Sequence, residues 1–289
     1  MSLQVFNKDQ LHFISKGAIH RQTLRKQIDD ALTKNKFKRN FIISSLPGLG
    51  KTYEMEQAIK QLTDPPIVFK GDGSFFTYFI DIATAMYLNG GHKNPLTVVN
   101  DDCDILFSDK VINTTKKMFD DTRVLRYGKN YLSLKPLCSE TQWEAIQSFA
   151  DENKAGIELD VSNVTFITLT NMHLQTVDEV EAQEDGSSKY EKYNARYAIR
   201  RRTTYKEIEM PLEELWGYVA DVVLNEKICE KFIPTISQQH KEQILQWLYV
   251  KWTKGLTERN LSIVEKMTMD IDSYPTDYLD IWEQEYVAN

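Results

Sequence analysis

Cysteine and histidine are scarce in this sequence, and both are scattered. Of the 289 residues, three are cysteine (Cys103, Cys138 and Cys229) and five are histidine. No two cysteines have the close spacing of a metal-binding or redox pair, and the histidines show no ligand spacing. The sequence therefore predicts neither a disulfide framework nor a metal site built from these residues, and it favours a reducing compartment such as the cytoplasm.

Long apolar runs and an excess of positive charge are also missing. No apolar stretch approaches the roughly 20 residues that span a bilayer, and the first residues lack the layout of a signal peptide. We therefore expect a cytoplasmic protein without a membrane partner. The sequence has 35 Lys and Arg residues and 42 Asp and Glu residues, so its net charge is −7. This charge disfavours binding of nucleic acid over a large part of the surface. Two basic clusters, at 36–39 and 196–202, could contact phosphates or simply be solvated.

Short apolar segments alternate with helical patterns over the first two thirds of the chain. Strands are expected at 41–44, 66–70, 96–101 and 164–170, and a last strand at 207–210. Helices are expected around 21–33, 52–62, 76–88 and 110–119. This alternation predicts an α/β fold with a mostly parallel sheet that helices cover on both faces.

Two segments interrupt the alternation. Residues 129–160 are expected to form an insertion, with a helix that Ser139 and Gln142 begin as a capping box. Residues 179–192 are polar and acidic and contain Gly and Ser, which predicts a mobile loop.

After residue 210 the sequence becomes wholly helical. Pro211 suits a first helical position, a second helix is expected at about 238–254, and Thr257 is a candidate N-cap for a third. The chain is thus expected to divide into a lead-in with a helix (1–40), an α/β domain (41–210) and a helical part with a tail (211–289).

The stretch SSLPGLGKT at residues 44–52 has the pattern of a phosphate-binding loop. That pattern, G-x-x-x-x-G-K-[ST], is matched except that Ser45 takes the place of the first glycine. Gly48 and Gly50 give the backbone the freedom to surround an anion, Lys51 would reach the terminal phosphates, and the Thr52 hydroxyl would bind Mg²⁺. The expected nucleotide-binding residues are Leu46, Pro47, Gly48, Leu49, Gly50, Lys51, Thr52 and Tyr53. The alternative is an ordinary strand–turn–helix with a surface lysine.

Acidic residues follow the third expected strand, in LTVVNDDCD at residues 96–104. Asp101 would hold the metal through water, and Asp102 would polarise the attacking water. Asp104 is the next candidate for that base. Because the carboxyl ends of parallel strands meet at one edge of a sheet, these carboxylates and the phosphate loop are expected at the same edge. Acidic residues in an ordinary turn are the alternative.

With these motifs the chain resembles the AAA+ ATPases, and more closely those encoded by bacteriophages. The resemblance covers about residues 20–270, and the phage-type part depends on DDCDILFSDKVINTTKKMFDDTRVLRY at 101–127. It implies the AAA+ P-loop NTPase fold, in which helices sandwich a parallel sheet and a small helical lid follows. It also implies ATP and Mg²⁺ as cofactors and, for a phage protein, the host cytoplasm as location.

The resemblance implies roles for three further residues. Asn171, after the strand VTFITLT, matches sensor 1, which helps to position the lytic water; a capping Asn is the alternative. Arg202 best matches the arginine finger that enters a neighbouring subunit's site, with Arg201 next and a solvated basic cluster as the alternative. Arg259 matches sensor 2, which reaches the nucleotide from the lid; an exposed arginine at a helix start is the alternative.

Other matches are weaker or depart from the family. Its usual Asp-Glu pair is Asp101-Asp102 here, and the shorter second carboxylate puts fast hydrolysis in doubt. Phe75 and Phe76 lie where many members have a substrate-gripping pore loop, although such aromatics more often pack on the next helix. The acidic, aromatic tail at 274–289 could dock a partner or pack on the lid.

The expected function is Mg²⁺-dependent ATP hydrolysis by a homo-oligomeric ring or spiral that remodels a protein or nucleic-acid substrate. A slowly hydrolysing ATP-dependent switch or scaffold is the main alternative. A small-molecule P-loop kinase fits less well, because no substrate-binding lid replaces the helical C-terminal part.

Overall fold

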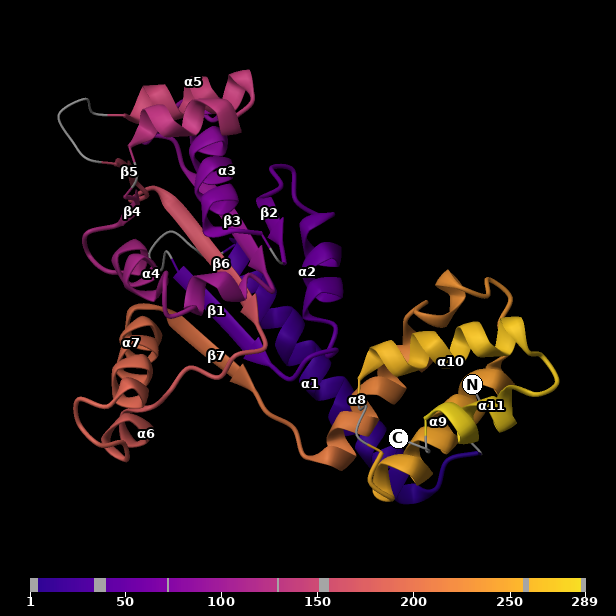
Figure 1. The fold of residues 1–289 in the computed structure, drawn as a ribbon. Helices are drawn as coiled ribbons and strands as arrows, with labels where there is room; N and C mark the ends of the chain where they lie inside the picture. Colours follow the sequence, from indigo (N-terminus) through magenta and orange to yellow (C-terminus); the bar gives the residue numbers. More distant parts are fainter. Residues whose placement is uncertain are drawn as a thin grey trace. The chain divides into compact units, whose positions relative to one another are not determined.

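The computed structural model describes residues 5–33, 40–71, 73–128, 130–150, 156–256 and 260–286 (Figure 1). The chain divides into two compact units. We call residues 27–45 and 55–207 the sheet unit, and residues 1–26, 46–54 and 208–289 the helical unit. Helices α1 (Lys8–Thr33) and α2 (Lys51–Ile59) each contribute residues to both units. The domain boundaries expected at residues 40 and 210 stay a prediction.

A five-stranded sheet forms the centre of the sheet unit. Its strands are β1 (Asn40–Ser45), β2 (Ile67–Lys70), β3 (Leu96–Asp101), β6 (Val164–Thr170) and β7 (Thr204–Ile208). They lie in the order β2-β3-β6-β1-β7. The pairs β2–β3, β3–β6 and β6–β1 are parallel, and the β7 arrow points the same way in Figure 1. The predicted α/β fold with a parallel sheet is confirmed.

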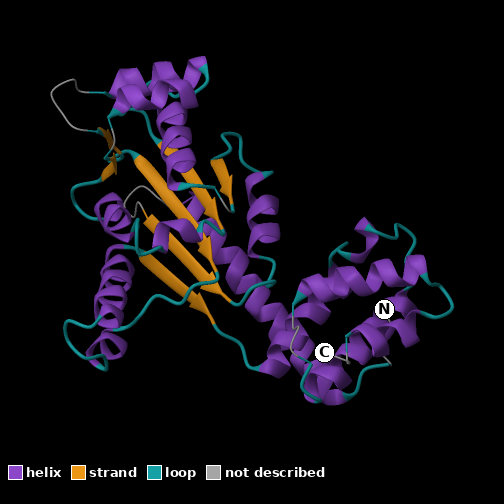
Figure 2. Cartoon of the chain, viewed as in Figure 1, coloured by secondary structure: helices purple, strands orange, loops and turns teal. Residues whose placement is uncertain are grey.

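Helices flank this sheet, and a further helical part follows it in the sequence (Figure 2). The sheet unit contains α3 (Phe75–Leu88), η1 (Asp104–Phe107), α4 (Ile112–Phe119), η2 (Tyr131–Leu137), α5 (Glu140–Phe149), α6 (Val177–Glu181) and α7 (Ser188–Arg202). A small antiparallel pair joins β4 (Val124–Tyr127) to β5 (Ile157–Asp160). The helical unit contains α8 (Leu212–Asn225), η3 (Cys229–Lys231), α9 (Gln238–Thr253), α10 (Leu261–Ser273) and α11 (Tyr278–Glu285). Among the helices described, none is long and apolar enough to cross a bilayer.

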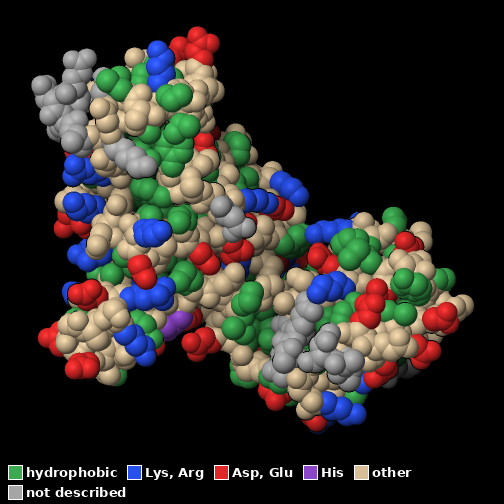
Figure 3. Space-filling model, in the orientation of Figure 1, with side chains coloured by type: hydrophobic (Ala, Val, Ile, Leu, Met, Phe, Trp, Pro, Cys, Tyr) green, Lys and Arg blue, Asp and Glu red, His purple; other side chains and the backbone are tan. Residues whose placement is uncertain are grey.

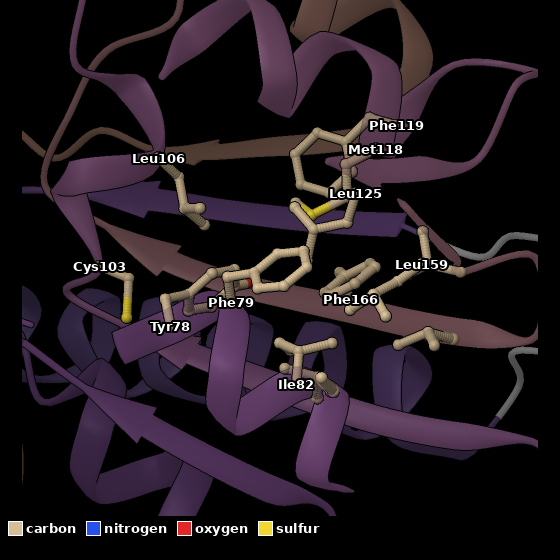
Figure 4. Close-up of a cluster of buried hydrophobic side chains, with 14 of the residues drawn as sticks. Tyr78, Phe79, Ile82, Cys103, Leu106, Met118, Phe119, Leu125, Leu159 and Phe166 are labelled. Carbon is tan, nitrogen blue, oxygen red and sulfur yellow. The ribbon is translucent and has the colours of Figure 1, made fainter. Parts of the chain in front are cut away.

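The sheet is buried on both faces. Side chains alternate along a strand, so Ile42, Val98 and Phe166 share one face, where they join the core that contains Phe79 of α3. Figure 4 shows Phe79 at the centre of that cluster. On the opposite face Ile43 and several neighbours in β3 and β6 are buried as well: Val99, Ile167 and Leu169. Burial of both faces explains why these strands are nearly continuous apolar runs in the sequence.

The prediction of a mobile loop at 179–192 is wrong. Residues of this stretch form part of α6 and α7, and α7 packs against α4 and α6. Thr176 and Glu179 form a capping box at the start of α6, and the Ser187 side chain caps α7. The Gly and Ser residues of this stretch separate α6 from α7, and Ser187 caps the start of α7. Composition alone predicts a loop for such residues.

At the ends of other helices and strands, one prediction is confirmed and others differ from the structure. The capping box of Ser139 and Gln142 is confirmed at the start of α5. The last strand begins earlier than expected, at Thr204, and Pro211 is the N-cap of α8 and not its first helical residue. Asn260 caps the third C-terminal helix, α10, whereas the predicted cap Thr257 lies outside the described residues.

Helices α1 and α8 cross at two glycines. A Cβ on Gly17 would lie 2.1 Å from the carbonyl carbon of Gly217 and 2.1 Å from the amide nitrogen of Tyr218. A Cβ on Gly217 would lie 1.9 Å from the carbonyl oxygen of Phe13. The atoms in the way belong to the backbone, so no side-chain rotation can make room. The packing of the helical unit therefore depends on glycine at this crossing.

We expect Gly17→Ala to destabilise the helical unit. Alanine has the higher helix propensity by about 1 kcal/mol, but forcing the two backbones apart costs about 1–3 kcal/mol or more. The clash should therefore outweigh the gain. Urea denaturation followed by circular dichroism checks this, with Ser15→Ala at an exposed position of α1 as the matched control. Equal stability of the two variants would contradict the close crossing.

Candidate functional site

The glycine-containing loop lies between β1 and α2, as the sequence predicts. Strand β1 ends at Ser45 and α2 begins at Lys51. Gly48 has φ +74° and Gly50 has φ +71°, both in the left-handed region that glycine adopts at little cost. Gly50 stands where the motif reserves glycine and Gly48 does not, yet both have a backbone conformation that favours glycine.

The same loop is fastened to α8 and α10 by its backbone. The carbonyl oxygen of Gly48 accepts a hydrogen bond of 3.1 Å from the amide of Leu261. The Tyr218 hydroxyl donates to the carbonyl oxygen of Leu49, whose side chain is buried. A Cβ on Gly48 would lie 2.2 Å from the Cβ of Asn260. The loop is thus held in a fixed shape by residues that the sequence motif does not contain.

Lys51 lies at the first position of α2 and is 5% exposed. Its ammonium group donates to the carbonyl oxygen of Leu46 at 3.3 Å, so it lies over the loop. The N-terminus of a helix carries a partial positive charge and free N–H groups, and a lysine there adds a full charge. Both attract an anion, so this end of α2 suits a phosphate group.

The acidic residues lie at the carboxyl edge of the sheet. Asp101 is the last residue of β3 and is buried, whereas Asp102 is exposed and has φ +54°. A non-glycine residue in this conformation costs about 1–2 kcal/mol. The Asn171 amide, which follows β6, donates to Asp102 Oδ1 at 3.1 Å. The structure therefore brings together the residues expected as catalytic base and sensor 1.

The neighbouring side chains distinguish Asp102 from the other candidates. Asp104 Oδ1 accepts a hydrogen bond of 3.1 Å from the Thr170 hydroxyl. Burial, with a contribution from Asp101, raises the pKa of the Cys103 thiol to about 11, so this cysteine is un-ionised near neutral pH. Asp102 is the exposed carboxylate that touches Asn171.

A magnesium ion would find few protein ligands here. Within the described residues, no group of three or more His, Cys, Asp or Glu side chains could hold a metal. Mg²⁺ usually takes one or two protein oxygens and completes its shell with phosphate oxygens and water. The Thr52 hydroxyl in the helical unit and the Asp101 carboxylate in the sheet unit are each an oxygen donor of the kind that Mg²⁺ takes.

The arginines that precede β7 have different surroundings. Arg200 donates to the carbonyl oxygen of Leu174 at 2.5 Å and lies over the Tyr205 ring at 4.4 Å. Arg201 and Arg202 are exposed at the end of α7, and Arg202 donates to a carbonyl of its own helix, that of Ala198, at 2.8 Å. Figure 3 shows Lys and Arg side chains at the surface in the region of α7. Arg200 is thus fixed within the sheet unit, whereas Arg201 and Arg202 face solvent.

Two other predictions have different outcomes. Arg259, expected as sensor 2, lies outside the described residues. Phe75 and Phe76 begin α3, and their ring centroids lie 6.5 and 5.5 Å from that of Tyr127. The two aromatics thus pack against β4, and their role in a pore loop stays a prediction.

A histidine with two carboxylates lies two residues after Asn171. His173 Nδ1 is 2.6 Å from Glu207 Oε1, and His173 Nε2 is 2.8 Å from Glu179 Oε2. Although burial acts to lower the pKa of His173, the carboxylates of Glu207 and Glu179 raise it above its usual value. Nothing in the spacing of residues 173, 179 and 207 indicates this cluster, because β6, α6 and β7 bring it together.

The His173 cluster predicts a pH dependence of stability. Because the pKa of His173 is raised in the folded state, its stabilising contribution is fully present below the unfolded value of about 6.5 and is lost as pH rises through the folded value. The gain should be below about 1 kcal/mol, since these side chains are partly exposed. Urea denaturation of wild type and His173→Gln at pH 6 and pH 8.5 measures it. A difference between the proteins that is the same at both pH values would contradict the prediction.

Among known proteins, the similarity to this chain is found in solved structures and not in family models or curated sequences. No protein-family model matches the chain, and no curated protein matches it. Among solved structures it is similar to Hsp104 in a closed state with ATPγS and FITC casein, with 12% sequence identity and a TM-score of 0.38. That similarity covers 87% of this chain but only 40% of the Hsp104 chain. Neither a shared family nor a shared activity follows from similarity at this level.

Proposed function

We propose that the chain binds ATP with Mg²⁺ at residues 46–53 and hydrolyses it as an AAA-type ATPase. The observation that carries the proposal is the loop itself: Gly48 and Gly50 in left-handed conformations precede a helix N-terminus at which Lys51 is buried. A fixed loop, a helix N-terminus and a buried ammonium group together are the requirements of a phosphate site.

The acidic edge of the sheet supports hydrolysis as the reaction. Asp102 polarises the attacking water, and Asn171, which is hydrogen-bonded to Asp102, orients that water. The strained backbone of Asp102 is a second support, because such strain persists mainly where a functional site requires it. Thr52 and Asp101 would hold Mg²⁺, which would neutralise charge on the phosphates. Lys51 binds the terminal phosphates, and the sensor 2 role of Arg259, which the family resemblance implies, is part of the proposal.

The active form is a homo-oligomeric ring or spiral in which Arg202 completes a neighbour's site. Its exposed position at the end of α7 supports this role, with Arg201 as the second candidate. The oligomer remodels a protein or nucleic-acid substrate, and the resemblance at 101–127 makes a phage origin, and so the host cytoplasm, part of the proposal.

A slowly hydrolysing switch is the second candidate function. The observation that favours it is the short Asp102 side chain, which already makes a hydrogen bond with Asn171. Steady-state phosphate release separates the two candidates, because a remodelling ATPase turns over continuously whereas a switch retains ATP after binding it.

We expect Lys51→Ala to abolish detectable ATP binding while the fold is retained. The substitution removes the ammonium group that meets the terminal phosphates. Isothermal titration calorimetry with ATP and Mg²⁺ measures it, and circular dichroism checks the fold. Lys60→Ala, at an exposed position after α2, is the matched control and should bind as wild type does. ATP binding by folded Lys51→Ala at wild-type affinity would remove the basis of the proposal.

Arg202→Ala should leave ATP affinity nearly intact and reduce hydrolysis by about 10³-fold or more, because an arginine finger meets charge that develops in the transition state. Mixing it with Lys51→Ala should restore some phosphate release, since the Lys51 variant still presents its own Arg202 to an intact neighbouring loop. An inactive mixture in which mixed oligomers are detected would exclude Arg202 as a finger in trans, and Arg201→Ala would then be the variant to measure.

A further inference from the structure

An ion cluster joins α1, α2 and α8 within the helical unit, and α2 directly follows the phosphate loop in the sequence. Its members are Arg21, Arg25, Glu54, Asp221 and Glu226. Arg25 contacts Glu54 through Nε and Glu226 Oε1 through Nη2, the latter at 2.8 Å. Arg21 contacts Asp221 Oδ2 at 2.6 Å and also pairs with Glu226. We call these five side chains the α1–α8 ion cluster.

Glu54 is the member of the cluster nearest in sequence to the loop. It lies three residues after Lys51, in the first turn of α2, and is 3% exposed. Residues three apart on a helix lie on the same side, so positions 51 and 54 share one face of that turn. Burial raises the pKa of Glu54, and the hydrogen bond from Arg25 opposes that rise. Arg25 is the cation that compensates this buried carboxylate.

The position of Glu54 creates a conflict for an anion site. A carboxylate in the first turn is attracted by the same helix N-terminus that would attract a phosphate, and it repels a phosphate by Coulomb interaction. Arg25 removes this conflict, because it places a guanidinium against the Glu54 carboxylate. Arg25 is itself fixed by Glu226 of α8, and Glu226 also accepts a hydrogen bond of 3.2 Å from the Tyr53 hydroxyl.

We propose that Arg25 is a positioning residue for phosphate binding, because it neutralises Glu54 and so removes the repulsion between this carboxylate and a phosphate at the N-terminus of α2. This proposal rests on the proposed binding of ATP at residues 46–53. Arg25 needs no contact with the nucleotide, since it acts through Glu54. The remaining contacts of the cluster hold Arg25 in place.

Arg25→Met tests this role when it is combined with Glu54→Gln. Arg25→Met leaves the Glu54 carboxylate uncompensated, so ATP should bind about ten-fold more weakly, which corresponds to a modest Coulomb repulsion near the protein surface. In the double variant Arg25→Met/Glu54→Gln the repelling charge is gone, and affinity should return to within about two-fold of wild type. A purely structural role for the ion pair predicts a loss of thermal stability that the second substitution recovers, whereas the proposal predicts weaker ATP binding by Arg25→Met that is still fully folded at the titration temperature. Titration calorimetry with ATP and Mg²⁺ gives each dissociation constant, and thermal unfolding checks each fold.

Two controls separate the possible failures. Lys16→Met removes an exposed cation of α1 outside the cluster and should bind ATP as wild type does. If neither wild type nor Lys16→Met binds ATP, the proposed function fails. If both bind and Arg25→Met binds equally well, or Glu54→Gln does not restore a loss, the role of Arg25 is overturned.

The single variant Glu54→Gln keeps the proposal testable should Arg25→Met not fold. It removes the repelling charge and leaves Arg25 paired with Glu226. ATP should then bind at least as tightly as to wild type, and Arg25→Lys, which keeps the positive charge, should stay within about two-fold of wild type. Weaker ATP binding by folded Glu54→Gln would overturn the inference.

Discussion

The hydrogen bond from the Leu261 amide to the Gly48 carbonyl oxygen is the constraint on which the candidate phosphate site depends. It fastens the loop to the first residue of α10, and the absence of a side chain at Gly48 lets Asn260 approach. Gly48 is therefore required twice, for its positive φ and for this contact. The motif that binds phosphate is at the same time the motif that docks the loop on the helical unit, so a substitution at Gly48 would damage both.

The parallel sheet could be predicted from the sequence because both of its faces are buried. Strand β6 at Val164–Thr170 and strand β3 at Leu96–Asp101 have the predicted ends, since a doubly buried strand is an apolar run with polar residues at its limits. Helices α6 and α7 could not be predicted in this way. Their surfaces are mostly polar, and the Ser187 cap after Gly186 has the composition of a loop. Burial of a few residues such as Ile199 against α4 outweighs that composition.

Some contacts of the candidate site could likewise be predicted from the sequence, and others could not. The pairing of Asp102 with Asn171 follows from topology, because the two residues come directly after neighbouring strands. The hydrogen bond between Tyr218 and Leu49 joins residues 169 apart and has no signature in the sequence. Arg25 and Glu54 likewise belong to helices whose crossing only the fold determines. Sequence motifs thus predict the residues that would touch a nucleotide. Which residues hold the loop in place, and which compensate a nearby charge, is determined by the packing of the helices.

The three consecutive arginines at the end of α7 show why a basic cluster alone is weak evidence for function. Cations are favoured at the C-terminus of any helix, because they interact with its partial negative charge. Arg200 has a further structural role, since it bonds to Leu174 and lies over Tyr205. Arg202 differs from Arg200 because its guanidinium donates to a carbonyl of its own helix, a bond that can be exchanged for one to a neighbouring molecule at little cost. The fold thus fixes one arginine of the run and leaves the last at the surface, where a trans-acting group has to be.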